Sequence, residues 1–334
     1  MSSGYLLSRG DIQKYFVSET SLWASLNYLF SDSCQKTSTY KFGLLKSILD
    51  NLFNMEPSDR GMELSYFSLF SRFTENYWNL ITHYHIRQMR KDRFSRMTKL
   101  EMIFSEYTGV TPVGEIIEFS SLSENDQQAI ITRVTKECKR YVIGALYSDF
   151  DGVLYGFDLK GSGIWINKVA YEFLMKYKIG IEQLNYYAWA KYLEKINTDS
   201  ALAKVLDKLE LSTPRRKDLS VFRRILADEF EIKTCFYCGK KLNNSSHVDH
   251  VIPWSFIKGD NLWNFVLSCP SCNAKKRDKL PTQVWLSRVI TRNEEMVLVN
   301  SPIIRQEFRT YSADQMWKIW EYAQIGGMRV YNEV

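Results

Sequence analysis

Apolar residues recur at helical spacing over much of the first 225 residues of the chain. The stripe between 42 and 52 predicts one amphipathic helix, and the aromatic-rich stretch from Leu64 to Met89 predicts a longer one. Ser123, with Asp126 three residues later, has the character of a helix N-cap, and the apolar positions after it form one face. The two apolar faces consist of Phe42, Leu45, Ile48, Leu49 and Leu52, and of Ile130, Ile131, Val134, Cys138, Tyr141 and Val142.

Apolar and polar residues alternate from Val153 to Leu159, which predicts a β-strand. Lys160 to Gly163 have turn composition, and the apolar run that ends at Ile166 then predicts the second strand of a β-hairpin. The residues from Thr108 to Gly114, rich in Gly and Pro, predict a loop. The pattern as a whole predicts a mainly α fold with small β elements, in which the helical N-terminal part contains one hairpin.

Helical patterns resume from 168 to 197, and a short helix is predicted over 200–209. Thr213-Pro214 begins another helix, with Pro at its first position. Ser312 and Gln315 form a capping-box pattern that opens a last helix, which ends at Gly326. We therefore expect three parts: a helical domain for recognition, sensing or partner binding, a central module, and a helical extension that packs back on the body. Their predicted bounds are 1–225, 226–293 and 294–334.

The composition is that of a folded globular protein, with 45% apolar, 14% aromatic and 25% charged residues among 334. The longest apolar runs are too short for a membrane span, and the N-terminal residues lack the pattern of a signal peptide. Four of the six cysteines have metal-binding spacing, which suits a reducing compartment better than a disulfide framework does. Cys34 and Cys138 stand alone and suit a buried environment. We expect a cytoplasmic protein.

Two Cys-x-x-Cys pairs, Cys235/Cys238 and Cys269/Cys272, begin 34 residues apart. Four thiolates in two such pairs can form a tetrahedral zinc site. Such a site would be structural, because four thiolates leave no open position for a reacting water. A redox pair or unrelated thiols are the alternatives. The segment is too small for a stable core of its own, and zinc would contribute about 10–16 kcal/mol to its folding.

Positive charge is concentrated around these cysteines. Residues 231–292 contain ten Lys or Arg and four Asp or Glu, a net charge of +6 that equals the net charge of the whole chain. This excess is typical of a surface for polyphosphates. A second basic cluster consists of Arg87, Arg90, Lys91, Arg93, Arg96 and Lys99. It is interpreted as a solvated helix face, with phosphate contact as the alternative.

The residues between and after the cysteines resemble those of HNH (ββα-metal, or His-Me finger) endonucleases that contain a four-cysteine zinc site. The resemblance covers about residues 231–292 and rests on Asp249-His250-Val251-Ile252-Pro253, then Asn264, then Asn273 and the basic run after it. It implies a ββα-metal fold in which Asp249 binds the catalytic cation and His250 is the general base. It also implies that Asn273 completes a Mg²⁺ site, in which Mn²⁺ can substitute. Asn264 would brace the loop before the helix, and the alternative there is an ordinary turn asparagine.

The three other histidines are interpreted without a role as general base. His247 lies two residues before Asp249 and would share its strand face, where it could bind metal, contact phosphate or have a supporting role. His83 and His85 are two residues apart on a predicted helix, so they do not share a face and are interpreted as structural.

The helix that begins at Asn273 is expected to present four basic side chains to phosphates, namely Lys275, Lys276, Arg277 and Lys279. The resemblance thus implies hydrolysis of DNA phosphodiester bonds, with 5′-phosphate and 3′-hydroxyl ends. By analogy we expect a role in bacterial restriction or anti-phage defence, with an activating or regulatory protein partner. The alternatives are an HNH nuclease that acts on RNA and a non-cleaving zinc-dependent protein that binds nucleic acid or serves as a scaffold.

Overall fold

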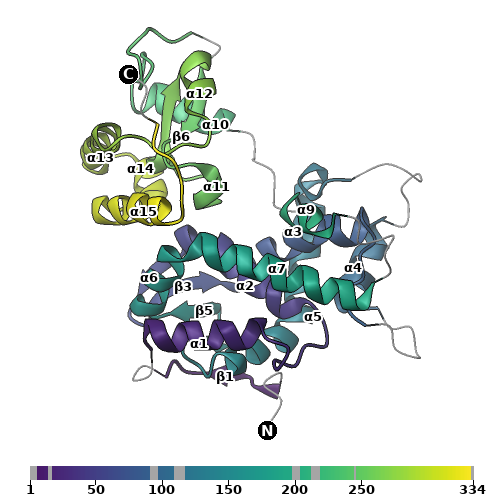
Figure 1. Ribbon diagram of the computed structural model, residues 1–334. Helices are drawn as coiled ribbons and strands as arrows, with labels where there is room; N and C mark the ends of the chain where they lie inside the picture. The colour runs from purple at the N-terminus through teal and green to yellow at the C-terminus, as the bar shows by residue number, and fades with distance from the viewer. Residues whose placement is uncertain are drawn as a thin grey trace. The chain divides into compact units, whose positions relative to one another are not determined.

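The computed structural model describes residues 6–13, 17–90, 97–108, 117–197, 204–211, 219–243 and 246–331. The chain forms two compact units (Figure 1). The first consists of Met1–Leu174 and Gly180–Arg215, and the second of Met175–Ile179 and Arg216–Val334. The predicted fold class, mainly α with small β elements, is confirmed.

The helices and strands up to residue 211 form the larger unit, apart from the short segment around the junction of α6 and α7. They are β1 (Arg9–Gly10), α1 (Glu19–Phe30), α2 (Tyr40–Asp50), η3 (Leu52–Asn54), β2 (Glu56–Ser58), β3 (Gly61–Ser65), α3 (Tyr66–Thr82), α4 (Lys99–Thr108), η4 (Phe119–Ser121), α5 (Glu124–Asp149), β4 (Gly156–Asp158), β5 (Gly163–Ile166), α6 (Lys168–Lys176), α7 (Lys178–Ile196) and α9 (Val205–Leu211).

The β-structure of the first unit is an antiparallel sheet with the strand order β1-β4-β5-β3-β2. The predicted hairpin is present as β4 and β5, but the prediction of a single hairpin is wrong, because five strands are joined in one sheet. A second hairpin, β2–β3, turns at Gly61, whose φ of +131° favours glycine. Figure 1 shows β3 and β5 side by side, and Leu64 pairs with Ile164 across them.

The long helix predicted from Leu64 to Met89 is shorter at both ends. Leu64 belongs to β3, and α3 begins after Ser65, whose side chain accepts a hydrogen bond from the Ser68 amide. The helix ends at Thr82, so His83 and His85 lie in the following loop, and their predicted place on a helix is wrong. His85 has a φ of +50°, which ends the helical path.

Helices α2, α3 and α5 pack on one another in the core of the first unit. The predicted helix over 42–52 is confirmed as α2, and the Ser123 side chain caps α5 by accepting from the Asp126 amide. The apolar face of α5 is buried except at Tyr141, which is exposed. Lys46 of α2 is fully buried and neutralised by the carboxylates of Asp50 and Glu182.

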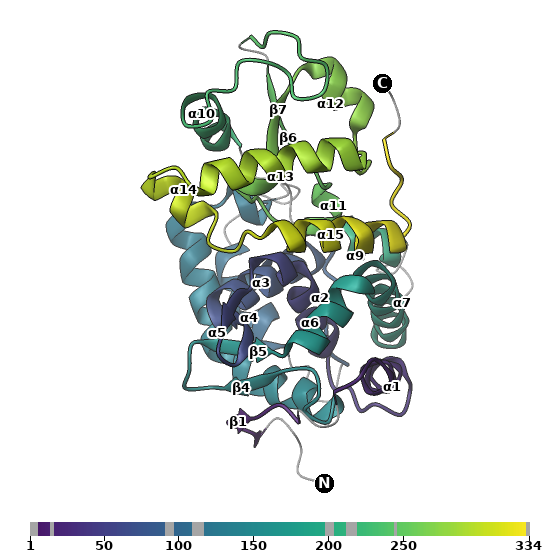
Figure 2. The ribbon, with the colours of Figure 1, turned by 90° about the vertical axis from the view of Figure 1, so that its left-hand side faces the viewer.

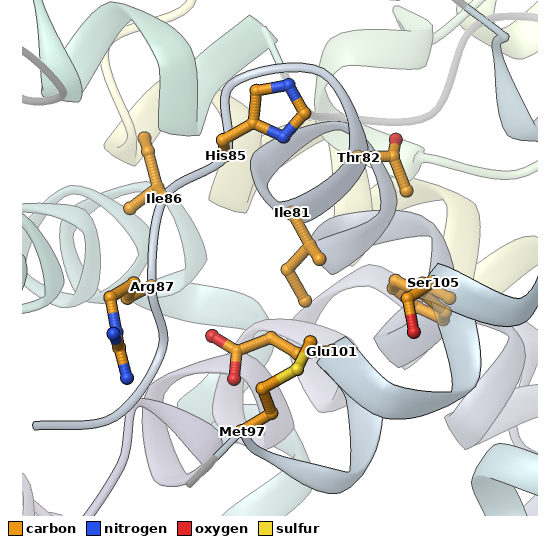
Figure 3. Close-up of a pocket in the computed structure, with 9 residues that line it drawn as sticks. Ile81, Thr82, His85, Ile86, Arg87, Met97, Glu101 and Ser105 are labelled. Atoms are coloured by element: carbon orange, nitrogen blue, oxygen red, sulfur yellow. The ribbon is translucent and has the colours of Figure 1, made fainter. Parts of the chain in front are cut away.

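A cavity of about 300 Å³ lies between the end of α3, the loop after it and α4 (Figure 3). Its one carboxylate, Glu101, is buried and accepts hydrogen bonds from the backbone amides of Gln88 (2.9 Å) and Thr98 (2.5 Å). In Figure 3 the ring of His85 turns away from this carboxylate. Glu101 therefore holds two loop segments together. The cavity is lined by Ile81, Thr82, His85, Ile86, Arg87, Met97, Glu101, Phe104 and Ser105.

The second unit contains a two-stranded antiparallel sheet surrounded by short helices. Figure 2 shows β6 and β7 side by side, with α12 next to them. Its elements are α10 (Ser220–Asp228), β6 (His247–His250), α11 (Trp254–Ile257), η5 (Leu262–Asn264), β7 (Phe265–Ser268), α12 (Pro270–Lys276), α13 (Gln283–Val297), α14 (Pro302–Glu307) and α15 (Ala313–Ile325). The order β6, β7, α12 is the predicted ββα arrangement.

Helix α13 is joined to the sheet by polar side chains. The Arg292 guanidinium donates to the backbone oxygen of Phe265 (2.6 Å), and the Asn293 amide donates to the backbone oxygen of Trp263 (2.8 Å). The C-terminal residues continue this packing, because the Trp320 indole donates to the Pro281 oxygen (2.8 Å). The predicted cap of α15 is confirmed, since the Ser312 side chain accepts from the Gln315 amide.

Several sequence-based expectations lie outside the described residues. These are the predicted loop beyond Thr108, which itself is the last residue of α4, the start of the short helix at Ser200, the helix start at Thr213-Pro214, and the basic residues Lys91, Arg93 and Arg96. Helix α10 spans the predicted boundary between residues 225 and 226 and contacts both β6 and β7. Among the described residues, no helix combines the length and the apolar character that crossing a bilayer requires.

Candidate functional site

The four cysteines with metal-binding spacing come together in the second unit. Their sulfur atoms all lie within 4.8 Å of one another, and the Sγ atoms of Cys238 and Cys269 are 3.9 Å apart. Zn–S bonds of about 2.3 Å in a tetrahedron put sulfur atoms roughly 3.8 Å apart. The cluster of Cys235, Cys238, Cys269 and Cys272, termed the four-cysteine cluster below, therefore has the donor set and the spacing that zinc requires.

Local backbone structure explains how the two pairs meet. Cys235 and Cys238 lie in a turn closed by hydrogen bonds from the Cys235 amide to Lys240 and from the Gly239 amide to Cys235. Cys269 is the N-cap of α12, and the amide of Cys272 in its first turn donates to the Cys269 sulfur. This amide lowers the pKa of Cys269 to about 7, whereas burial raises the pKa of Cys272. A cation is thus needed to keep Cys272 as a thiolate.

Asp249 and His250 are the last two residues of β6, and their side chains point to opposite faces of the strand. The register pairs Asp249 with Val266 and His250 with Phe265. Both side chains are largely buried. The strand ends here, because the backbone bends at Val251, whose amide donates to the Asn264 oxygen (2.8 Å).

The Asp249 carboxylate has two partners on the same oxygen, Oδ2. The Tyr237 hydroxyl donates to it at 2.5 Å, and the Lys276 ammonium lies 3.2 Å away. Burial of the hydroxyl and the negative charge of Asp249 raise the pKa of Tyr237 well above its usual value. Tyr237 therefore keeps its proton and acts as a donor to the carboxylate.

The sequence predicted that Lys276 contacts phosphate, but its side chain is buried. Its side chain is 0% exposed, and the ammonium also donates to the backbone oxygen of His250 (2.7 Å). The ammonium is enclosed between the last two residues of β6 and so is not presented to solvent. Lys275 and Arg277 of the same basic run are exposed, and Lys279 lies over the ring of Tyr331, 5.3 Å from its centre.

The His250 ring is held between a carboxylate and an aromatic ring. Its Nε2 atom lies 3.1 Å from Oδ1 of Asp260, and Phe265 packs edge-on at 4.6 Å between ring centres. The side chain is 4% exposed. These contacts fix the orientation of the ring.

Asn273 and His247 meet on the face of β6 that carries Asp249. The Asn273 Nδ2 and His247 Nδ1 atoms are 3.4 Å apart. Helix α12 thus places Asn273 beside the start of the strand and Lys276, one turn later, beside Asp249. Oδ1 of Asp249 has no hydrogen-bond partner among the described residues. A carboxylate oxygen with an amide and an imidazole nearby is a donor set that fits a hard divalent cation.

The Asn264 side chain is completely buried and braces the bend after β6. Its Oδ1 accepts from the Ile252 amide, and its Nδ2 donates to the Ile252 oxygen, both at 2.9 Å. The two hydrogen bonds pair both backbone polar groups of Ile252. This geometry supports the bracing role that the resemblance implies for Asn264.

We expect Asn264→Asp to lower the free energy of unfolding of the second unit by at least about 1–3 kcal/mol, because a carboxylate would face the Ile252 oxygen without the donor it replaces. Chemical denaturation with zinc present measures the effect. Asn300→Asp, at an exposed position, is the matched control and should change stability little. Equal losses in the two variants would contradict the bracing role.

Three features of this site were missed by sequence reasoning: Tyr237, Asp260 and the buried position of Lys276. Tyr237 lies inside a Cys-x-x-Cys pair, where the intervening residues carry no signal of their own. Asp260 follows His250 by ten residues in an irregular segment, so no periodicity relates the two. The charge of Lys276 predicted exposure, and only the packing of α12 on β6 shows otherwise.

The comparisons with known proteins agree with this geometry over one segment. Residues 235–279 match the family model described as HNH endonuclease. No curated protein and no solved structure matches the chain. The matched segment begins at the first cysteine of the four-cysteine cluster and contains β6, β7 and α12. Residues 235–279 therefore form an HNH endonuclease domain.

Proposed function

We propose that the second unit hydrolyses phosphodiester bonds of DNA with the help of a divalent cation. The observation that carries this proposal is that Asp249 and His250 end β6 inside the HNH domain, with Asn273 of α12 beside His247 on the face that carries Asp249. Binding alone would require none of Asp249, His250 and Asn273 in this arrangement. A non-cleaving binding or scaffold protein is therefore the weaker alternative.

Asp249 and Asn273 would hold the cation, with His247 adjacent. Mg²⁺, for which Mn²⁺ can substitute, would neutralise charge on the phosphate and on the leaving 3′-oxygen. The four-cysteine cluster would bind zinc, which has a structural role because four thiolates fill its coordination sphere.

His250 is proposed as the general base. Asp260 holds the proton on Nε2, so that Nδ1 accepts the proton of the attacking water. The small exposed fraction of the ring limits this transfer to a water in direct contact with it. Attack would leave 5′-phosphate and 3′-hydroxyl ends.

The exposed basic residues of the α12 region are proposed to bind the backbone of the substrate. Lys275 and Arg277 are exposed, and Lys279 is partly exposed beside Tyr331. Lys276 has a different role in this proposal: it orients Asp249 and the end of β6. Phosphate contacts of this kind fix position without reading sequence.

We place the activity in bacterial restriction or anti-phage defence, and assign target choice or the response to a protein partner to the first unit. The support is the organisation of the chain, in which a small HNH domain is joined to a larger compact unit that carries none of the proposed catalytic residues. A cytoplasmic location fits this role.

The test is incubation of the purified protein with supercoiled plasmid and with a folded RNA, each with Mg²⁺ and with EDTA. Cleavage of the plasmid that EDTA prevents is the expected result. Discrete bands would indicate sequence specificity, and cleavage of RNA alone would assign the other substrate. If neither nucleic acid is cut at any Mg²⁺ or Mn²⁺ concentration, the isolated protein is not a nuclease.

A further inference from the structure

Tyr237 lies between Cys235 and Cys238, and its hydroxyl reaches the carboxylate of Asp249 at 2.5 Å. We propose that Tyr237 is a positioning residue that couples the zinc-binding turn to the carboxylate that holds the reacting cation. This inference rests on the proposed role of Asp249 as a cation ligand. It adds a function to the four-cysteine cluster, which would then set cation affinity as well as stability.

The hydrogen bond and the ion pair of Asp249 are both made by the same carboxylate oxygen. Tyr237 and Lys276 both approach Oδ2, whereas Oδ1 has no partner in the described part of the chain. The hydrogen bond from Tyr237 and the ion pair with Lys276, both on one oxygen, fix the rotation of the carboxylate about its χ2 angle. The carboxylate therefore presents Oδ1, with its charge undiminished by a direct donor, to a cation.

The Tyr237 ring is itself held by the second unit. It packs edge-on against Trp285 of α13, with ring centres 4.8 Å apart. The adjacent Phe236 amide donates to the Leu267 oxygen of β7 (3.0 Å), so the turn is joined to the strand opposite Asp249. Zinc bound at Cys235 and Cys238 would fix the turn on both sides of the tyrosine. The hydroxyl thus has one position, set by the turn.

Lys276 does not make Tyr237 redundant. The ammonium lies farther from Oδ2, at 3.2 Å, and also donates to the His250 oxygen at 2.7 Å. A lysine end group can follow a rotating carboxylate, because it has three equivalent donors on a flexible stem. A phenol on a packed ring cannot. The tyrosine is therefore the donor that determines direction.

The experiment measures Mn²⁺ binding to the zinc-loaded full-length protein by electron paramagnetic resonance, without nucleic acid. We expect Tyr237→Phe to weaken Mn²⁺ affinity about 10- to 100-fold, the usual cost of losing a partner of a metal ligand. In cleavage assays the Mg²⁺ concentration for half-maximal rate should rise by the same factor, and the rate at saturating Mg²⁺ should stay near that of the wild type. Zinc content should not change.

Two further variants complete the design. Tyr311→Phe is the matched control, because its hydroxyl contacts the Ile290 oxygen (3.4 Å) in the same unit and away from Asp249. Asp249→Asn shows how much Mn²⁺ binding depends on the carboxylate. If Tyr237→Phe binds Mn²⁺ as the wild type does, or if Asp249→Asn has no effect, the inference is wrong.

A second measurement covers the case in which Tyr237→Phe fails to fold. With 3-fluorotyrosine at position 237, Mg²⁺ should shift the ¹⁹F resonance in the wild type but not in Asp249→Asn, and an unmoved resonance would overturn the inference. The proposed function fails separately. If the wild type cuts no nucleic acid while Tyr237→Phe still weakens Mn²⁺ binding, the nuclease proposal is wrong and the positioning role stands.

Discussion

His250→Asn is expected to lower the rate of DNA cleavage by about 10²–10⁴-fold, the usual contribution of a general base. Asparagine keeps a polar group near Asp260 and fills part of the space beside Phe265, so the protein should stay folded. Alanine is the poorer choice, because it would leave a cavity at a buried position. The measurement is the single-turnover rate on plasmid at saturating Mg²⁺.

The controls separate chemistry from folding. His85→Asn, at an exposed position in the first unit, should cleave at the wild-type rate. Zinc content and the urea midpoint of His250→Asn should remain close to those of the wild type. Cleavage within a factor of three of the wild type would show that another group accepts the proton.

Cys269→Ser is expected to release zinc and unfold the second unit. Structural zinc contributes about 10–16 kcal/mol to the folding of small domains. The total free energy of unfolding of a typical protein is only roughly 5–15 kcal/mol, so loss of zinc can remove the whole stability of the second unit. The sheet of the second unit has two strands, and such hairpins are marginal alone. Hydrogen exchange of the β6 and β7 amides, with zinc measured by mass spectrometry, gives the readout.

Cys34→Ser is the matched control for this loss. Cys34 is buried in the first unit and its thiol lies 3.5 Å from Asp149, where a serine hydroxyl can also donate. This variant should keep one zinc per chain and normal exchange in β6. A Cys269→Ser protein that lacks zinc yet protects the β6 amides as well as the wild type does would show that the metal is not needed for the fold.

The four-cysteine cluster could be predicted from the spacing of its cysteines alone, because two Cys-x-x-Cys turns can supply the four ligands of one tetrahedral metal ion. Helices α5 and α15 could be predicted for a similar reason, since Ser123 and Ser312 mark their first turns by a local hydrogen bond. In these elements the signal lies within a few residues.

The remaining features depend on contacts between distant residues. The local sequence around Leu64 is compatible with a helix or a strand. Leu64 lies in a strand because it pairs with Ile164, which is a hundred residues away in the sequence. Lys276 reads as a surface residue until α12 packs on β6 and encloses its ammonium against Asp249. Asp260 reaches His250 only after the chain bends at Ile252. The sequence thus predicted candidate reacting groups but not the residues that contact them in the fold.

The attachment of α13 defines the smallest piece of this chain that can be moved to another protein. The family match ends at Lys279, but Arg292 and Asn293 satisfy backbone oxygens of β7 and of η5 from beyond that limit. At the far end, the Leu280 amide donates to Arg329 and the Tyr331 amide to Leu280. A transplant cut at residue 279 would expose those carbonyls, whereas one running from 219 to 331 would bring their partners with it. The transferable unit is therefore more than twice as long as the segment that matches the family model.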